Sequence, residues 1–300
     1  MKVFVTGVAG QLGYDVVNEL CSRGHEVIAS DVIGEWNGNV PYVSLDITDA
    51  LAVERVILDA APDVIVHCAA WTAVDAAEDE SNQGKVRAIN VDGTQNMVDA
   101  AKRVNAKMVY ISTDYVFDGQ GTEPWQPDCK EYAPLNVYGQ TKLDGEQAVA
   151  NTLEKYFIVR IAWVFGLNGK NFIKTMLQVG KNHAQVRVVN DQIGTPTYTY
   201  DLARLLADMI ETDKYGYYHA TNEGGYISWY DFTKEIYRQA GMNTEVLPVT
   251  TAEYGCSKAA RPFNSRLDKA KLAESGFEPL PSWQDALERY LQELKKQGEL

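Results

Sequence analysis

Short runs rich in β-branched residues alternate with longer amphipathic stretches through the first half of this 300-residue chain. Strand-like runs fall at residues 3–5, 27–29, 40–45, 64–66, 108–111 and 157–161. Continuous apolar runs of this length are typical of parallel strands that are buried on both faces. The alternation therefore predicts an α/β fold: a doubly wound parallel sheet of the Rossmann type, with crossover helices on both faces.

The spacing of apolar residues predicts helices over residues 11–22, 50–60, 84–104 and 137–152 of this first half. After Trp163 the rhythm loosens into loops rich in Gly, Pro, Asn and Tyr, with helical patterns near 171–179, 201–209, 229–239 and 283–296. We expect an NAD(P)-binding Rossmann domain over residues 1–162, with a returning segment near 190–212. Residues 163–300 are expected to form mainly a smaller, substrate-binding lobe.

The charge balance limits what the protein binds. A formal net charge of −13 argues against nucleic acid or an acidic membrane surface as a partner, because both require a dense basic face.

The amino terminus lacks the apolar core of a signal peptide, and no run approaches the ~18 apolar residues of a membrane span, so we expect a cytoplasmic protein. The four cysteines and four histidines show no spacing typical of a metal site.

Three glycines follow the first predicted strand in the spacing GxxGxxG. Gly7, Gly10 and Gly13 stand where a strand turns into a helix, and Gln11 and Leu12 open that helix. Backbone amides at such a turn bind a pyrophosphate, although glycines also occur in turns with no ligand. The position at the first strand-to-helix junction favours a dinucleotide cofactor.

Polar residues at the ends of later strands continue this cofactor site. Asp31 ends the second strand, where its carboxylate accepts hydrogen bonds from ribose hydroxyls and repels a 2′-phosphate, so NADH is favoured over NADPH. The alternative is a solvated acid at a strand end. Two further segments at carboxyl ends of strands are expected beside the cofactor: Asp46 with Ile47, and Ala69, Ala70, Trp71 and Thr72.

A tyrosine and a lysine are placed for proton transfer. Tyr138 and Lys142 are four positions apart on a predicted helix and so share one face. A free tyrosine has a pKa near 10, and a nearby ammonium is expected to lower the pKa of Tyr138. A YxxxK pair often arises by chance, but the hydroxyl of Thr113, at the end of the fifth strand, supports a catalytic set of Thr113, Tyr138 and Lys142.

Several longer motifs occur in a fixed order along the chain: GxxGxxG, STDYVFDG from Ser112, YGQTKLDGE from Tyr138, RIAWVFG from Arg160, DQIGTPT from Asp191 and RPFNSRL from Arg261. The series covers nearly the whole chain and closely resembles the dTDP-4-dehydrorhamnose reductases of the extended short-chain dehydrogenase/reductase superfamily. The resemblance implies reduction of a nucleotide-sugar C4 ketone with NADH or NADPH, in the synthesis of a rhamnose precursor for polysaccharides.

The resemblance also implies roles for single residues. Tyr138 would protonate the C4 oxygen, Thr113 would stabilise the developing oxyanion, and Lys142 would bind the nicotinamide ribose. Asp114 and Trp163 match substrate positions of the family. The family's cofactor contacts match Gly10, Gln11, Leu12, Asp31, Asp46, Ile47, Ala70, Trp71 and Thr72.

Two further expectations carry an alternative. Arg261 is a candidate partner for the substrate diphosphate, or else forms a salt bridge with an acidic neighbour. Asn90 matches an asparagine that seats the catalytic lysine in the superfamily, or else lies on a helix surface.

Some family members bind magnesium at a dimer interface through glutamates, but Asp15 and Tyr200–Asp201 reproduce that pattern poorly, so no metal is predicted. A homodimer is the assembly that this comparison suggests, and the sequence leaves the oligomeric state open.

Two other functions share much of this pattern. A regulatory subunit of methionine adenosyltransferase has the same fold and an STDYVFDG-like segment, but the intact Thr113, Tyr138 and Lys142 favour an enzyme. A nucleotide-sugar epimerase or dehydratase uses the same triad and keeps its cofactor bound. Dehydratases add acidic residues beside the threonine, and Asp114–Tyr115 matches that arrangement only in part.

Overall fold

The computed structural model describes residues 1–255 and 257–300. Its main sheet has seven strands in the order β11-β6-β5-β4-β1-β2-β3, and every neighbouring pair is parallel. Along the chain these strands are β1 (Lys2–Thr6), β2 (Glu26–Asp31), β3 (Tyr42–Ser44), β4 (Val64–His67), β5 (Lys107–Thr113), β6 (Tyr156–Ile161) and β11 (Gly216–His219). The predicted doubly wound α/β fold is confirmed.

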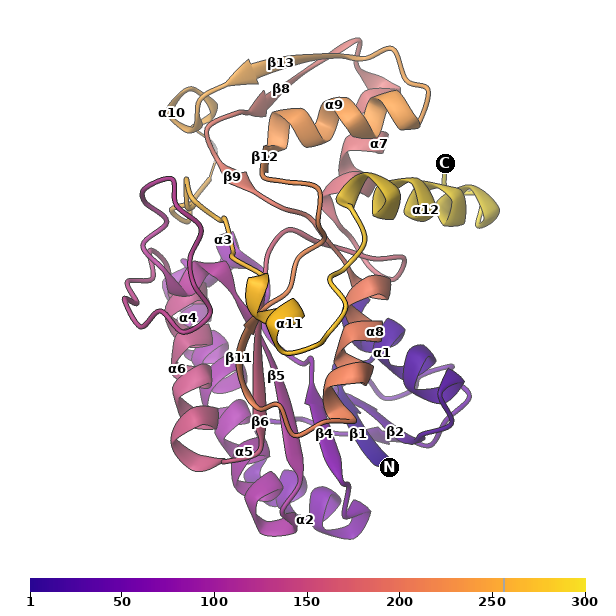
Figure 1. Ribbon diagram of the computed structural model, residues 1–300, viewed down its shortest axis with the longest axis vertical. Helices are drawn as coiled ribbons and strands as arrows, with labels where there is room; N and C mark the ends of the chain where they lie inside the picture. Colours follow the sequence, from indigo (N-terminus) through magenta and orange to yellow (C-terminus); the bar gives the residue numbers. More distant parts are fainter. Residues whose placement is uncertain (256) are drawn as a thin grey trace.

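Helices cover both faces of this sheet, as Figure 1 shows. On one face, α2 (Ala50–Ala60), α5 (Gly93–Val104) and α6 (Val137–Thr152) enclose a core that contains Phe4, Ile65, Met108 and Ile158. On the other face, α1 (Gln11–Ser22) and α8 (Thr199–Ile210) pack together over Val3, Val66, Val109 and Val159. Alternate residues of each strand therefore face different cores, as the period of a strand requires.

The helix predicted over residues 84–104 is interrupted. The chain forms two short helices, α3 (Val74–Ala77) and α4 (Glu80–Arg87), then a π-helical turn, η1 (Ala88–Asp92), and only then α5. A π turn holds one more residue than a regular helical turn, and such turns are frequent at functional sites. Here the turn places Asn90 inside the protein, with 1% of its surface exposed.

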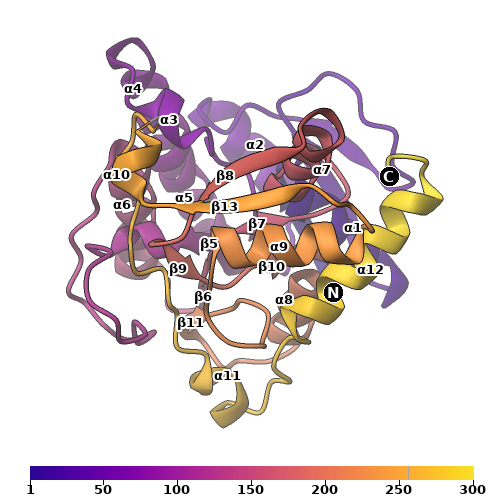
Figure 2. The ribbon, with the colours of Figure 1, turned by 90° about the horizontal axis from the view of Figure 1, so that it is seen from above.

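A smaller lobe lies above the sheet in Figure 1, and Figure 2 shows this lobe from above. It contains the parallel pair β8 (Gln185–Val189) and β13 (Glu245–Val249) and the helices α7 (Phe172–Asn182), α9 (Trp229–Gln239), α10 (Thr251–Tyr254) and α12 (Trp283–Lys296). Aromatic residues such as Phe165, Phe232 and Tyr290 fill its core. Two short ladders join the lobe to the sheet region, β7 (Val164–Phe165) with β10 (Thr197–Tyr198) and β9 (Ile193–Gly194) with β12 (Ile227–Ser228).

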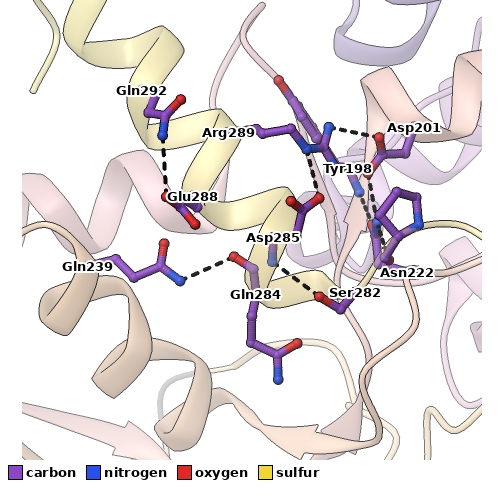
Figure 3. Close-up of polar contacts among 11 residues, drawn as sticks. Tyr198, Asp201, Asn222, Gln239, Ser282, Gln284, Asp285, Glu288, Arg289 and Gln292 are labelled. Carbon is purple, nitrogen blue, oxygen red and sulfur yellow. Dashed lines mark hydrogen bonds and ion pairs between the residues drawn. The ribbon is translucent and has the colours of Figure 1, made fainter.

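The end of the chain contributes to both parts. Leu272 of the short helix α11 (Ala270–Glu274), with Phe277 and Leu280 after it, packs into the core under α1 and α8. Another short helix, η2 (Asp114–Val116), directly follows β5. Figure 3 shows how α12 is then attached to α8: the Arg289 guanidinium donates to both carboxylate oxygens of the buried Asp201, at 2.9 and 2.8 Å. Asn222 donates to the same carboxylate at 2.8 Å. In the part of the chain that the structure describes, no helix has the length and apolar character needed to span a bilayer.

Candidate active site

The glycine turn after β1 forms one wall of a large cavity. Gly7 has φ +71°, a conformation that side chains disfavour, and a Cβ on Gly13 would lie 2.2 Å from the Gly7 carbonyl oxygen. Helix α1 begins here with Gly10 as its N-cap, and no side chain caps it. The first-turn amides and the positive end of the helix dipole are therefore available to an anion.

Asp31 is held against this turn. Its Oδ2 accepts a hydrogen bond from the Ala9 amide at 2.9 Å, and its Oδ1 accepts one from the Val32 amide at 2.8 Å. The carboxylate thus orders the turn as well as lining the cavity. Both oxygens keep lone pairs for further donors.

The cavity has a volume of about 870 Å³ and runs between the sheet and the smaller lobe. It gathers the sequence-predicted positions from seven separate segments of the chain. Those that line it are Gly7, Gly10, Gln11, Leu12, Gly13, Asp31, Asp46, Ile47, Ala69, Ala70, Trp71, Thr72, Thr113, Asp114, Tyr138, Lys142 and Trp163. Arg261 is the predicted site residue that does not line it.

Tyr138 and Lys142 stand on the first turns of α6. Asn136 caps this helix, its Oδ1 accepting from the Gly139 amide at 2.8 Å. A Cβ on Gly139 would lie 2.4 Å from the Tyr115 carbonyl oxygen, so a glycine lets the helix start close against η2. This approach places the Tyr115 ring edge-on to Tyr138, with 5.7 Å between centroids.

The ionisation of the pair differs from the sequence-based expectation. Burial raises the pKa of Tyr138, and the negative charge of Asp114 adds to this, while a hydrogen bond with Thr113 opposes it. Burial lowers the pKa of Lys142 to about 7, against the charge of Glu146. The expectation that the ammonium lowers the pKa of Tyr138 was wrong, because burial and Asp114 raise this pKa instead. The Lys142 Nζ lies 4.0 Å from the ring centroid of Tyr110.

Thr113 and Asp114 lie beside Tyr138 at the end of β5. The Thr113 hydroxyl donates to Asp114 Oδ1 at 3.0 Å, and its oxygen accepts from the Tyr115 amide at 3.3 Å. The Asp114 carboxyl is 2% exposed, and burial raises its pKa to about 6. The site therefore places a carboxyl that protonates readily next to the tyrosine.

Trp163 forms an aromatic stack with a residue that the sequence did not single out. The rings of Trp163 and Trp229 are 3.7 Å apart at their centroids, with planes 16° apart, and both line the cavity. Trp163 has φ +50°, a strained conformation for a tryptophan and one that occurs preferentially at functional sites. Trp229 is the first residue of α9, and no spacing in the sequence links it to Trp163. Sequence reasoning therefore missed its place in the site.

Arg261 occurs in a salt bridge. Its Nη2 donates to Asp75 Oδ2 at 2.6 Å, and its Nη1 lies 3.5 Å from the Tyr115 hydroxyl. Asp75 also accepts from the amides of Lys258 and Ala259, at 3.1 and 3.0 Å, so it fastens this segment to α3. The acidic partner that the sequence left as an alternative is present, and the guanidinium lies next to a residue of the cavity wall.

Asn90 connects the cavity wall to the catalytic helix and is not a surface residue. Its Oδ1 accepts from the Trp71 amide at 2.7 Å. Its Nδ2 donates to the Trp71 carbonyl at 3.2 Å and to the Thr141 hydroxyl at 3.0 Å. Thr141 immediately precedes Lys142, so the asparagine fixes the helix against the strand end that lines the cavity.

The acids considered for magnesium have protein partners. Asp15 Oδ2 accepts from the Thr199 hydroxyl at 2.5 Å, and Asp201 is paired with Arg289. Burial raises the pKa of Asp15 to about 6. Within residues 1–255 and 257–300, no three His, Cys, Asp or Glu side chains gather as metal ligands would.

A sheet wound in this order, with a tyrosine and lysine one helical turn apart beside the threonine that ends its fifth strand, defines the class of protein. The chain is an extended short-chain dehydrogenase/reductase. The family model described as RmlD substrate binding domain matches residues 1–296, and the chain belongs to that family.

Similar proteins support this assignment over almost the whole length. The spore coat polysaccharide biosynthesis protein SpsK of Bacillus subtilis is 39% identical, across 97% of each chain. A dTDP-4-dehydrorhamnose reductase of Streptomyces griseus is also 39% identical, across 94% of this chain and 90% of its own. The crystal structure of dTDP-4-dehydrorhamnose reductase from Bacillus anthracis in complex with NADP is 41% identical and has a TM-score of 0.89, covering 97% of this chain and 99% of that one.

Proposed function

We propose that this protein is a dTDP-4-dehydrorhamnose reductase, which reduces the C4 ketone of dTDP-4-dehydro-L-rhamnose with NADH or NADPH and yields dTDP-L-rhamnose. The observation that carries the proposal is the single cavity in which the glycine turn and Asp31 meet Thr113, Tyr138 and Lys142. The similarity to curated reductases over nearly the full chain supports the same substrate.

The cavity has the groups that a dinucleotide needs. The uncapped amino end of α1 offers amides to the pyrophosphate, and Asp31 offers a carboxylate to the ribose hydroxyls. The hydroxyls of Ser30 and Ser112 also line the cavity, are buried, and have no partner among the described residues. Buried polar groups are nearly always satisfied, so these two hydroxyls favour a polar ligand in this place.

Tyr138 is assigned as the proton donor. A bound reduced nicotinamide supplies the hydride that reaches C4 of the sugar. The negative charge then develops on the C4 oxygen, and the proton must come from a group that is protonated at neutral pH. Tyr138 is such a group, because burial raises its pKa above the ordinary value.

Other residues stabilise the transfer or bind the cofactor and the substrate. The Thr113 hydroxyl, which lies next to Tyr138, stabilises the developing oxyanion. Lys142 binds the nicotinamide ribose through its ammonium. Asp114 and the Trp163–Trp229 stack bind the nucleotide sugar, while Arg261 releases Asp75 and binds the diphosphate.

Turnover of the sugar nucleotide tests the proposal. Purified protein is mixed with NADH or NADPH and dTDP-4-dehydro-L-rhamnose, and the absorbance of the reduced nicotinamide is followed. Loss of reduced cofactor equal to the amount of substrate supports the reductase. Saturating substrate with no loss, while cofactor binding is intact, would favour a binding module instead.

The same mixture distinguishes the remaining alternative. An epimerase or dehydratase regenerates its cofactor, so it converts the sugar without net change in the nicotinamide. Sugar products are therefore identified by mass spectrometry alongside the absorbance trace. Conversion at constant absorbance would identify that class.

A further inference from the structure

A series of hydrogen bonds, buried in its middle and partly buried at its ends, passes through His67, at the end of β4. On one side, the Ala69 amide donates to the Thr6 hydroxyl at 3.1 Å, and Thr6 Oγ1 lies 2.8 Å from His67 Nδ1. On the other side, His67 Nε2 lies 3.2 Å from Thr94 Oγ1, and that hydroxyl donates to the Asn90 carbonyl at 2.8 Å. Both ring nitrogens of a buried imidazole are thus in use.

The series reaches the two parts of the active site. Thr6 precedes the glycine turn, and both Thr6 and Ala69 line the cavity. At the far end, Asn90 Nδ2 donates to Thr141 Oγ1 at 3.0 Å, and Thr141 donates to the Tyr138 carbonyl, also at 3.0 Å. His67 is therefore the central member of a connection between the cofactor side and the catalytic helix.

The donors and acceptors fix the direction of each hydrogen bond in this series. Thr94 uses its proton on the Asn90 carbonyl, so its oxygen must accept from His67 Nε2–H. His67 Nδ1 is then unprotonated and accepts from Thr6, whose oxygen in turn accepts from the Ala69 amide. Burial, with the positive charge of Lys142, lowers the pKa of His67 to about 3, so the ring keeps this single neutral form over the working pH range.

We propose that His67 is a positioning residue, which holds the cofactor-binding turn and the Tyr138 helix in the relation that hydride and proton transfer require. The inference rests on the proposed reductase function. His67 is outside the lining of the cavity and acts through Thr6 and Thr94. Small misplacements of reacting groups reduce turnover strongly, whereas the separate binding of cofactor depends on the glycine turn and Asp31.

Two variants break the series at different points. His67→Leu removes both ring hydrogen bonds, and the nearly isosteric Thr94→Val removes only those of the threonine hydroxyl. The matched control is Tyr218→Phe in β11 of the same sheet, which also loses two hydrogen bonds, both partly buried, to the Lys214 carbonyl and to Ser275. We expect kcat to fall at least tenfold in the first two and less than twofold in the control, with the Kd of NADH within about threefold of wild type.

Amide hydrogen exchange in the cofactor-free protein supplies a readout that needs no turnover. Both test variants are expected to speed exchange at the two ends of the series, residues 69–72 and 138–142, and Tyr218→Phe to leave both ends unchanged. A kcat equal to that of the control, or unchanged exchange at either end, overturns the role of His67. An inactive wild type would instead overturn the reductase function, and exchange alone would then decide the role of His67.

Discussion

The indole of Trp163, just beyond the end of β6, lies parallel to that of Trp229, the first residue of α9, at a centroid distance of 3.7 Å. The stack is a direct contact between the sheet region and the smaller lobe at the wall of the cavity. The stack also helps to hold Trp163 at its positive φ, a conformation that is strained for a residue other than glycine. The geometry of the substrate side therefore depends on a residue of the other lobe.

Shortening Trp229 is expected to weaken substrate binding. Without its partner, the Trp163 ring loses a stack worth about 0.5–1.5 kcal/mol beyond its area burial, so Trp229→Ala should raise the KM of the nucleotide sugar about threefold to tenfold. Trp229→Phe keeps part of the stack and serves as the control. Steady-state kinetics with saturating NADH measure both, and an unchanged KM in Trp229→Ala would contradict the role.

Removing the phenol of Tyr138 should separate binding from chemistry. Tyr138→Phe keeps the ring that meets Tyr115 and loses only the proton donor, so we expect kcat to fall by about 10²–10⁴. The Kd of NADH, measured by fluorescence, should stay within about twofold. Activity close to wild type would show that another group donates the proton.

Cofactor binding is expected to take up a proton at Lys142. The pKa of this lysine is lowered to about 7 by burial in the cofactor-free protein, and the negative charge of the cofactor favours the ammonium. Below pH 7 the lysine is already charged, so the affinity for NADH should be constant there. Above pH 7 the affinity should fall by at most about tenfold per pH unit.

Calorimetry in buffers of different ionisation enthalpy measures this uptake directly. Lys142→Met serves as the control, since it cannot bind the proton. Equal uptake in the variant and in wild type would assign the proton to another group.

Asp114 is expected to cost stability at neutral pH. The pKa of its carboxyl is about 6 in the folded protein against 3.8 for the free group, so the folded state binds the proton more tightly. This effect lowers the free energy of unfolding as pH rises from about 4 to about 6, and the loss is complete above pH 6. Asp114→Asn should therefore gain on the order of 2–3 kcal/mol at pH 7.5 and little at pH 4.

Thermal unfolding at the two pH values tests the effect of Asp114. Asp15 has a similar pKa and contributes to the same curve, so the comparison is made between variant and wild type at each pH. An equal change in Tm at pH 4 and pH 7.5 would exclude the charge of Asp114 as the cause. A loss of turnover in the stabilised variant would support its position on the substrate side.

The charge of Asp31 is expected to set the preference between cofactors. Asp31→Asn removes the repulsion of a 2′-phosphate, so the ratio of kcat/KM for NADPH to that for NADH should rise at least tenfold, on the order of 1.4 kcal/mol. Asp46→Asn removes one charge from the same cavity and should change the ratio less. A wild-type enzyme that strongly prefers NADPH would overturn the assigned preference for NADH.

Much of the fold followed from the sequence because buried parallel strands and amphipathic helices leave strong patterns. The predicted range of α6 agrees with the structure, and those of α1 and α2 do as well. The short ladders β7–β10 and β9–β12 did not follow, since two-residue strands carry no periodicity. The helix predicted over residues 84–104 concealed a π turn, because a single extra residue in one turn leaves no clear mark on the spacing of apolar residues.

Individual residues of the site were predicted where a motif fixed their place on a strand end or a helix face. Thr113, Tyr138 and Lys142 are of this kind, and the structure brings all three to one cavity. Ionisation was harder to predict, because the pKa of Tyr138 depends on burial and on Asp114 rather than on spacing to Lys142. Contacts between distant segments, such as Trp229 with Trp163, left no signal in a single sequence.

The π turn at Ala88–Asp92 has a consequence for how this chain tolerates change in length. One residue adds about 100° of rotation to a helix, so the turn lets Asn90 face inward while Met97 and Ala101, further along, still face the core. The two requirements cannot both be met if one residue is removed between them. Deleting a single position from this turn should therefore turn either the asparagine or the apolar stripe of α5 away from the interior. This helix should tolerate substitutions far better than the loss of one residue.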